Sequence, residues 1–292
     1  MLSFNTPNDL KSKLLEIETN NTIHINSFIS SYENLSDDEL DLKSEEVAFN
    51  DQQTYSDFED LLEFSNSMRR EFVLQEFQWL QFDSLDLSTH PLNNFTFSYS
   101  EMTVLSDLGL IKVGASIVCA TSNGYIEVLD GDINKVESFL NGNTNIVNDP
   151  NVVDGLNKAS NGCKKWKGEI KNWYYNNYNN LVIAALHFKK WPWLAKGTGE
   201  MVSYKRRNFS NGWRKHWQML AIQTQNNFFD ATTCDGYTAQ AYIYVPASRG
   251  RNIALKHRVW GVSQQHRAKN GLTMFGYFYF NNSISHYFFL TW

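Results

Sequence analysis

The sequence predicts an α+β protein: an acidic helical N-terminal part with a small β-unit, followed by an antiparallel β-sandwich-like C-terminal domain. Three observations lead to this prediction. Segments near the N-terminus carry helix-capping signals, whereas the C-terminal part alternates with a period of two and is rich in aromatic residues. Charge divides the chain at the same place, since residues 1–150 hold 26 acidic and 7 basic side chains and residues 151–292 hold 5 and 19.

Residues 1–82 form the predicted helical region. Thr6 is a suitable cap for a first helix, Pro7 suits the first helical position, and Asp9 favours the positive end of the helix dipole. The apolar stripe of this helix consists of Leu10, Leu14 and Ile17. The polar residues 20–22 are expected to end it.

Two capping boxes follow in this region. Ser36 stands three residues before Glu39, and Ser56 stands three residues before Glu59. The second box predicts a long amphipathic helix that reaches about Phe82. The acidic residues between 33 and 60 are interpreted as a solvated surface rather than an interaction tail.

Residues 83–150 are predicted to hold a linker and a small β-hairpin unit. Residues 83–107 contain Pro91 and show little helical periodicity, so they are interpreted as a loop or linker. The pair Asn123-Gly124 predicts a hairpin, because both residues tolerate the positive φ of a type I′ turn. Three short strands at 110–113, 116–120 and 125–129 and a helix at 133–140, stopped by Gly142, complete this unit.

Residues 151–292 form the predicted antiparallel β-sandwich-like domain, which has no helices between its strands. Ile253, Leu255, His257 and Val259 alternate with Ala254, Lys256, Arg258 and Trp260, which is typical of a strand with an inner and an outer face. Pro246 is expected to end a strand over residues 239–245. The predicted strands cover residues 181–188, 200–206, 217–225, 239–245, 253–260, 272–280 and 284–292. The pairs Asn211-Gly212, Asp235-Gly236 and Asn270-Gly271 are predicted turns between them.

The three cysteines leave two interpretations open. Cys163 and Cys234 would form a disulfide in an oxidising compartment, with Cys119 buried in a strand, or all three would be unpaired core thiols. The sequence contains no run of about 18 apolar residues, so no membrane-spanning helix is predicted. The N-terminus lacks the pattern of a signal peptide, so export would require that a signal has already been removed.

A surface of basic and aromatic side chains is the main candidate for a binding site. Aromatic rings can stack on sugars, while cations bind sulfate, phosphate or carboxylate groups. The candidate ligand-binding residues are Trp213, Arg214, Lys256, Arg258, Trp260, His266 and Arg267. In the alternative interpretation, the tryptophans belong to the core and the cations form a solvated rim that faces the acidic N-terminal half.

Catalytic and metal-binding patterns are weak in this sequence. The seven histidines form none of the H-x-H, H-x-x-x-H or H-E-x-x-H patterns, so no metal, cofactor or catalytic residue is predicted. Acidic residues are scarce after residue 150, which argues against a paired-carboxylate glycosidase in the β-domain alone. No nucleic-acid partner is predicted, because no recognised module accompanies the basic residues.

The layout of the chain resembles that of exported proteins of gram-negative gut anaerobes that carry domains of unknown function. The counterparts in this sequence are the segments beginning Thr6-Pro7-Asn8-Asp9 and Ser36-Asp37-Asp38-Glu39 and the aromatic strands from Leu181 to Trp292. The resemblance implies export to the periplasm, the outer-membrane surface or the outside of the cell, often with a lipid anchor. It carries over no catalytic residue.

Three functions are compatible with these features. The first is non-catalytic binding of an anionic glycan or another surface polymer by the β-domain. The second is a hydrolase that uses His216, His257 or His266. The third is a structural or interaction protein in which the acidic and basic halves pack by charge.

Overall fold

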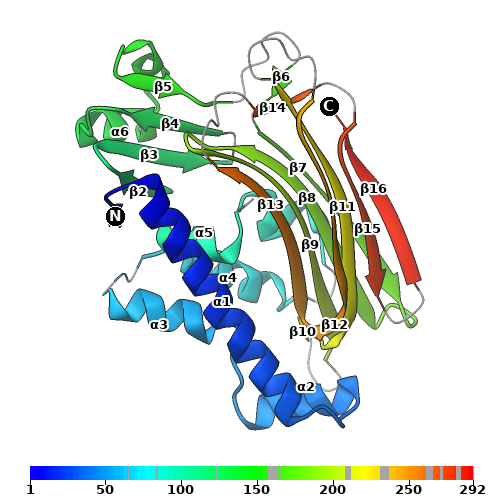
Figure 1. Cartoon of the computed structure of the whole chain (residues 1–292). Coiled ribbons are helices and arrows are strands. Elements are labelled where there is room, and N and C mark those ends of the chain that lie inside the picture. The colour runs from blue at the N-terminus through cyan, green and yellow to red at the C-terminus, as the bar shows by residue number, and fades with distance from the viewer. Residues whose placement is uncertain are drawn as a thin grey trace. The chain divides into compact units, whose positions relative to one another are not determined.

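The structure is a computed structural model of residues 1–292, and it confirms the α+β class, with helices mostly in the N-terminal part and strands in the C-terminal part (Figure 1). The structure describes the whole chain except residues 63, 65, 83–84, 96, 123, 157–162, 165, 208–211, 231–236, 261–265, 270–271, 281–283 and 292. Four of the turns predicted above, those at 123–124, 211–212, 235–236 and 270–271, lie wholly or partly outside the described residues.

The chain forms two compact units that are not contiguous in sequence. Unit 1 comprises residues 1–33, 49–74 and 97–156, and unit 2 comprises residues 34–48, 75–96 and 157–292. Unit 2 therefore contains two short segments from the N-terminal part of the chain, residues 34–48 and 75–96, in addition to the C-terminal strands. One of these, residues 34–48, is strongly acidic and supplies much of the candidate site described below.

Unit 1 begins with helix α1 (Pro7–Ser31), whose start agrees with the prediction. The Thr6 hydroxyl accepts a hydrogen bond from the Asp9 backbone N–H at 3.1 Å, and the Asp9 carboxylate accepts one from the Thr6 N–H at 3.0 Å. The predicted end at residues 20–22 is wrong, because the helix continues to Ser31. Packing explains the difference: Asn21 accepts a hydrogen bond from Thr54 at 2.8 Å, and Phe28 is buried further along the helix.

The long helix predicted from Ser56 to Phe82 is also wrong. The segment forms two helices, α3 (Gln53–Leu61) and α4 (Met68–Trp79), and Ser56 lies inside the first of them. The break allows Glu59, which is fully buried, to accept hydrogen bonds from Arg69 at 2.5 and 2.9 Å. A continuous helix would have kept these two side chains more than two turns apart.

The segment 83–107, interpreted as a loop or linker, contains a helix that the sequence analysis missed. Helix α5 (Tyr99–Val104) is wholly buried and begins with a capping box of Ser98 and Glu101. That box was visible in the sequence. The helix has only six residues, however, which is too short to show the apolar periodicity by which a helix is recognised. Two 3-10 turns, η1 (Leu87–Thr89) and η2 (Pro91–Asn93), precede it.

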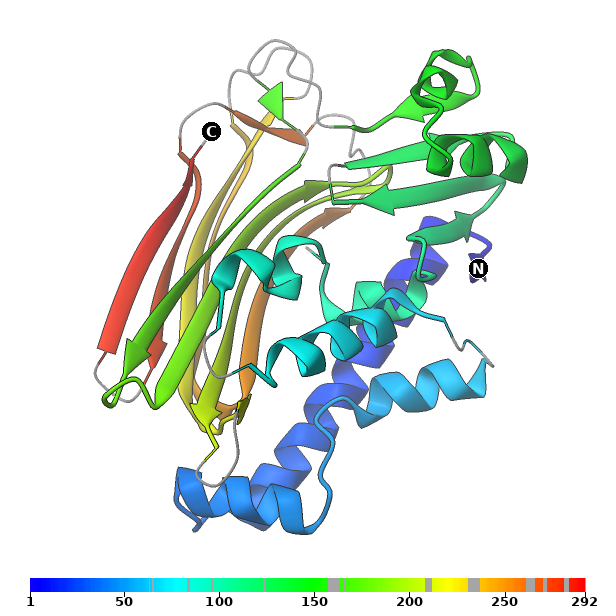
Figure 2. The same cartoon turned by 180° about the vertical axis from the view of Figure 1, so that it is seen from behind.

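The rest of unit 1 is a five-stranded sheet covered by a helix (Figure 2). Its strands follow the order β1 (Ser3–Phe4), β2 (Leu110–Val113), β3 (Ser116–Thr121), β4 (Gly124–Val128) and β5 (Val152–Asp154). Strands β2, β3 and β4 and helix α6 (Ile133–Leu140) are the predicted ones. Val136 of α6 packs with Ile117, Cys119 and Ile126 in a common core.

Unit 2 contains two antiparallel sheets that pack face to face, as predicted for a sandwich (Figure 1). The first sheet has the order β10 (Trp213–Lys215), β9 (Leu194–Arg206), β8 (Asn180–Lys190) and β7 (Trp166–Tyr175), with β13 (Asn252–Trp260) also paired to β9. The second has the order β16 (Ile284–Thr291), β15 (Leu272–Phe280), β11 (Gln218–Asp230), β14 (His266–Lys269) and β6 (Cys163–Lys164), with β12 (Tyr237–Gly250) paired to β11.

The sandwich core lies between the two sheets of unit 2. Successive side chains of a strand point to opposite faces of the sheet. On β8, Leu186 and Phe188 therefore point into the core, and His187 between them points away from it. Leu255 on β13 and Phe278 on β15 are buried in the same core, and for β13 this agrees with the prediction of an inner and an outer face. Gly199 permits the close approach of the sheets, because a Cβ atom there would lie 2.7 Å from a methyl carbon of Thr224.

Pro246 does not end its strand as predicted, because β12 continues to Gly250. The pairing of β12 with β11 is irregular at this point: Val245 pairs with Ile222, and Ser248 pairs with Leu220. Two residues of β12 therefore oppose one residue of β11. A bulge on a strand that pairs with one neighbour is a position where the missing proline N–H is tolerated.

A buried polar cluster lies against the outer face of the first sheet. The Tyr204 hydroxyl donates a hydrogen bond to Glu76 at 2.8 Å and lies 3.3 Å from Nε2 of His90. The ring of His90 is fully buried, and its Nδ1 accepts a hydrogen bond from the Leu92 N–H at 3.2 Å. Burial, reinforced by the charge of Lys215, lowers the pKa of His90 from 6.5 to about 3.

This pKa predicts that stability falls in acid. The unfolded state takes up a proton at the ordinary pKa of 6.5, whereas folded His90 stays neutral down to about 3, so stability is lost as the pH falls through that window. Between about pH 7 and pH 5 the loss from His90 is about 2 kcal/mol. Urea unfolding at both pH values should show a smaller loss in His90→Gln than in the wild type. Equal losses would contradict the prediction.

The cysteine predictions are tested only in part. Cys119 is a free thiol, fully buried in β3, and burial raises its pKa to about 12. The predicted disulfide of Cys163 and Cys234 lies outside the residues whose side chains are described, and it stays a prediction. Within the described part of the chain, we find no helix with the length and apolar character needed to cross a membrane.

Candidate functional site

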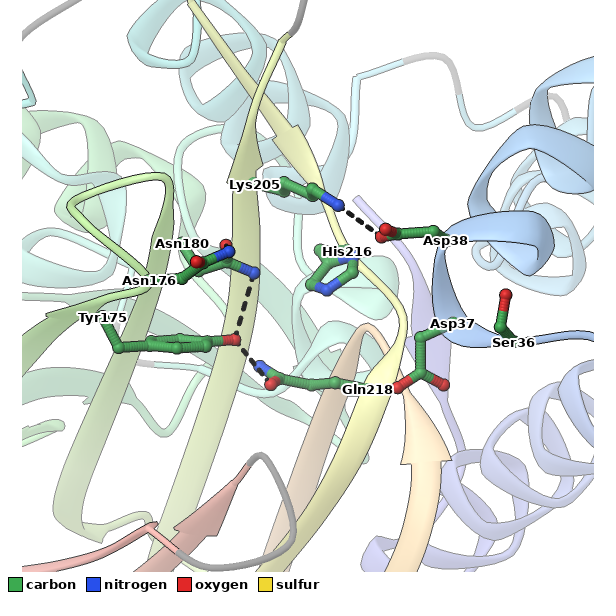
Figure 3. Close-up of a pocket in the computed structure, with 9 residues that line it drawn as sticks. All are labelled: Ser36, Asp37, Asp38, Tyr175, Asn176, Asn180, Lys205, His216 and Gln218. Atoms are coloured by element: carbon green, nitrogen blue, oxygen red, sulfur yellow. Dashed lines mark hydrogen bonds and ion pairs between the residues drawn. The ribbon is translucent and has the colours of Figure 1, made fainter.

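Unit 2 contains a polar pocket with a volume of about 520 Å³ (Figure 3). This volume lies within the range of small-molecule sites in proteins. One wall is the start of helix α2 (Asp37–Glu46), and the other is formed by strands of both sheets (Figure 3). The lining residues are Ser36, Asp37, Asp38, Tyr175, Asn176, Asn180, Lys205, His216 and Gln218.

The start of α2 is set by the capping box predicted from the sequence. The Ser36 hydroxyl accepts a hydrogen bond from the Glu39 N–H at 3.4 Å, and the Glu39 carboxylate accepts one from the Ser36 N–H at 2.8 Å. Because the helix begins here, Asp38 and Asp41 lie three residues apart on one face. This face meets the strands of unit 2.

A hydrogen-bond network orders the sheet side of the pocket (Figure 3). The Tyr175 hydroxyl donates to Oε1 of Gln218 at 2.7 Å and accepts from Nδ2 of Asn180 at 3.3 Å. Nδ2 of Asn176 donates to Oδ1 of Asn180 at 3.1 Å. Burial raises the pKa of Tyr175, so its hydroxyl keeps its proton at neutral pH. The pocket therefore presents amide and hydroxyl groups that are already held in place.

The turn between β7 and β8 supports this network, and its backbone adopts conformations that are unfavourable for most residues. Asn176, Asn177 and Tyr178 all adopt left-handed backbone conformations, with φ of 52°, 51° and 64°. Asparagine tolerates this region well, whereas tyrosine is held there at a cost of about 1 kcal/mol. The turn places the Asn176 side chain at the pocket.

Among the described residues, four ion pairs with lysine or arginine join α2 to the strands of unit 2. The Asp38 carboxylate accepts a hydrogen bond from Lys205, and this bond holds the pKa of Asp38 below its usual value. The other pairs are Arg249 with Asp37 at 2.8 Å, Arg214 with Glu45 at 3.1 Å and Arg214 with Asp41 at 3.4 Å. The acidic helix is thus neutralised locally by cations of the strands.

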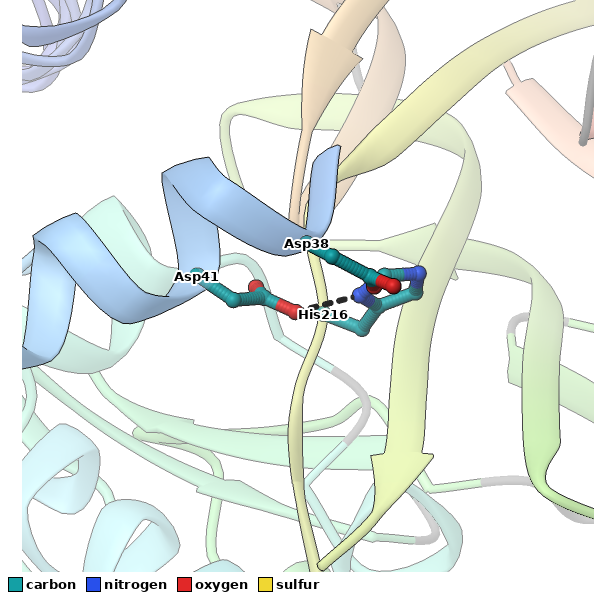
Figure 4. A group of neighbouring side chains, drawn as sticks. All are labelled: Asp38, Asp41 and His216. Carbon is teal, nitrogen blue, oxygen red and sulfur yellow. Dashed lines mark hydrogen bonds and ion pairs between the residues drawn. The ribbon is translucent and has the colours of Figure 1, made fainter. Parts of the chain in front are cut away.

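Asp41 and His216 form the most buried polar contact of the site (Figure 4). Oδ2 of Asp41 lies 2.6 Å from Nδ1 of His216, and Oδ1 accepts a hydrogen bond from the Trp217 N–H at 3.0 Å. Since a carboxylate accepts, Nδ1 of His216 carries the proton. In the neutral ring, Nε2 is then an acceptor.

Asp38, Asp41 and His216 also have the composition of a metal site. Their ligand atoms lie within 4.8 Å of one another. However, Lys205 is paired with Asp38, and Arg214 lies 3.4 Å from Asp41. A metal cation would have to displace these side chains or lie beside their charges, so the three residues fit a hydrogen-bonding role better than a metal-binding one.

The structure separates the predicted ligand-binding residues into two groups. Arg214 pairs with Lys205 on β9, and Arg258 pairs with Lys196, nine residues away along the same strand. At roughly 3.3 Å per residue, the two arginines lie about 30 Å apart. Trp213, near the first of them, is buried, while Lys256, Arg258 and Trp260 on β13 are half-buried. The side chains of His266 and Arg267 lie outside the described residues.

Of the three histidines considered for catalysis, His216 lines the pocket. His257 lies on β13, where burial lowers its pKa, and it is not among the lining residues. Sequence reasoning missed Tyr175, Asn180, Gln218, Asp38 and Asp41 as site residues. The capping box at Ser36 was the available signal for the acidic wall, whereas the amides of the strands carried none.

Comparisons with known proteins add little to this description. No family model matches the chain, and no curated protein matches its sequence. A solved structure that it is similar to is that of a DUF4848 family protein from Bacteroides thetaiotaomicron VPI-5482, with 10% identity over 99% of this chain and 96% of the other. The TM-score is 0.24.

Proposed function

We propose that this chain is a non-catalytic recognition protein, exported to the cell surface or beyond it, and that unit 2 binds one saccharide unit of an anionic glycan in its pocket. The observation that carries the proposal is the ordered polar lining around Tyr175, Asn180 and Gln218. Sugar hydroxyls both donate and accept hydrogen bonds. Amides, carboxylates and a tyrosine hydroxyl provide both kinds of partner.

The charge of unit 2 supports an anionic partner. Although its acidic helix pairs with several cations, unit 2 as a whole has 20 basic and 13 acidic side chains, a net charge of +7. A positive field raises the local concentration of a polyanion and speeds its association. The part of the proposal that concerns export is based on the layout of the sequence, and it does not depend on the pocket.

A second candidate function is hydrolysis with His216 as the general base. The 2.6 Å contact with Asp41 favours it, because a carboxylate on Nδ1 leaves Nε2 as an acceptor for a proton. The ionisation of the Asp38 carboxyl group argues against a glycosidase of the paired-carboxylate type. Such an enzyme needs a carboxyl group that stays protonated, whereas Lys205 lowers the pKa of Asp38.

The experiment is a glycan array of acidic and neutral polysaccharides, followed by calorimetric titration of each hit. Tyr175→Phe and Gln218→Ala remove one hydrogen-bonding group each, and each is expected to weaken binding about tenfold. Tyr244→Phe is the matched control, since Tyr244 is 53% exposed on β12 and does not line the pocket. Failure to bind any glycan, or equal binding by all variants, would overturn the proposal. Release of reducing ends from a hit would favour the second candidate.

A further inference from the structure

The outer face of the first sheet of unit 2 carries a compact group of basic side chains, separate from the pocket. In the strand registers, Thr198 of β9 lies between His187 of β8 and Lys256 of β13. One step along the sheet, Lys196 lies between Lys189 and Arg258. Directly opposed residues of antiparallel strands project on the same side, about 5 Å apart. We call these six residues the cationic rows.

The central members of the cationic rows are buried. Lys189 and Lys196 are 0% exposed, His187 is 2% exposed and Thr198 is 3% exposed. Like charges that face each other across strands destabilise a sheet, and burial increases the effect. Glu200 lies next to Thr198 on the same face of β9, but burial raises its pKa and so disfavours its charged form. The rows therefore bring several cationic side chains together, and the central ones are buried.

Two polar side chains of the rows have no hydrogen-bond partner among the described residues. These are His187, at both ring nitrogens, and Thr198, at its hydroxyl oxygen. Burial and the charges of Lys189 and Lys196 hold the pKa of His187 well below 6.5, so its ring is neutral and offers one N–H. Buried polar groups that lack a protein partner commonly bind an ordered water or an ion.

We propose that the cationic rows bind a compact oxyanion, sulfate or phosphate, through the two lysine ammonium groups, the His187 N–H and the Thr198 hydroxyl. All four groups are donors, and an oxyanion accepts several charge-assisted hydrogen bonds at once. A metal cation at His187 would be repelled by Lys189 and Lys196. The oxyanion is either a free ion or a substituent of a larger molecule. This site does not depend on the pocket proposal, because none of its residues lines the pocket.

The test is thermal unfolding of the full chain in sodium sulfate, in sodium phosphate and in sodium chloride at equal ionic strength. Binding to the folded state is expected to raise the Tm saturably, by about 3 °C or more over chloride. A separate arm uses galactose 6-sulfate. A rise with the free ions assigns the site to a free oxyanion, and a rise with the sugar ester alone assigns it to a substituent. No saturable rise in any arm overturns the proposal.

Variants separate the site from the general stabilising effect of sulfate on proteins. Lys196→Met removes a central charge with little change in side-chain volume, and Thr198→Val removes only the hydroxyl. Thr198→Val keeps the test decisive if Lys196→Met does not fold. Both should lose most of the saturable shift. Lys11→Met, at an exposed position of α1, is the matched control and should keep it. Equal shifts in wild type and in all three variants would also overturn the proposal.

Discussion

Asp41→Ala is expected to lower the free energy of unfolding of unit 2 by about 3 kcal/mol or more. The Asp41 carboxylate is fully buried and accepts hydrogen bonds from His216 at 2.6 Å and from the Trp217 N–H at 3.0 Å. Its removal leaves both donors buried without their partner. Helix α2 would also lose its most buried polar contact with the strands, so the acidic wall of the pocket should loosen.

Tryptophan fluorescence during urea unfolding measures this effect, because all nine tryptophans belong to unit 2. Glu45→Ala is the matched control on the same helix. The Glu45 side chain is 60% exposed and pairs with Arg214 at 3.1 Å, so its loss should cost less than about 1 kcal/mol. Equal losses in the two variants would show that Asp41 does not anchor α2.

Glu59→Gln is expected to lower the free energy of unfolding of unit 1 by about 3 to 5 kcal/mol. Glu59 is fully buried and accepts hydrogen bonds from Arg69 at 2.5 and 2.9 Å, from Arg70 at 2.8 Å and from Ser67 at 2.5 Å. A neutral amide leaves the charge of Arg69, whose side chain is 4% exposed, without its buried counter-ion. The contact also holds the break between α3 and α4.

Far-UV circular dichroism is the measurement for this variant, because α1, α3 and α5 belong to unit 1 and the unit holds no tryptophan. Asp60→Asn is the control: Asp60 is 69% exposed and pairs only with the partly exposed Arg70 in the described part of the chain. A shift of the dichroism transition that leaves the fluorescence transition unchanged would show that the units unfold separately. Absence of any shift would contradict the prediction.

Local patterns allowed much of the fold to be predicted. Thr6 and Ser36 start helices as expected, because a cap depends on residues three positions apart. The alternation around Leu255 predicted a strand with two different faces, because the side chains of a strand alternate between its faces, and the structure buries Leu255 in the core. Ser98 and Glu101 carried the same capping signal, although the segment was interpreted as a linker.

The candidate site was much less predictable. The basic residues Arg214 and Arg258 were grouped by their chemistry, but strand registers place them about 30 Å apart along β9. Tyr175, Asn180 and Gln218 are ordinary strand residues in the sequence, and they become a site only where three strands and α2 meet. That the two groups of basic residues bind a common partner stays a prediction.

The sequence by itself determined the α+β order, the starts of several helices, the alternating faces of the strands and the unequal distribution of charge. Only the tertiary structure decided that α1 continues past residue 22, that Pro246 lies in a bulge and that Asp41 meets His216, 175 residues away. The physical reason is the range of the interactions. Caps and periodicity act within a few residues, whereas burial and ion pairing depend on which distant segments the packed core brings together.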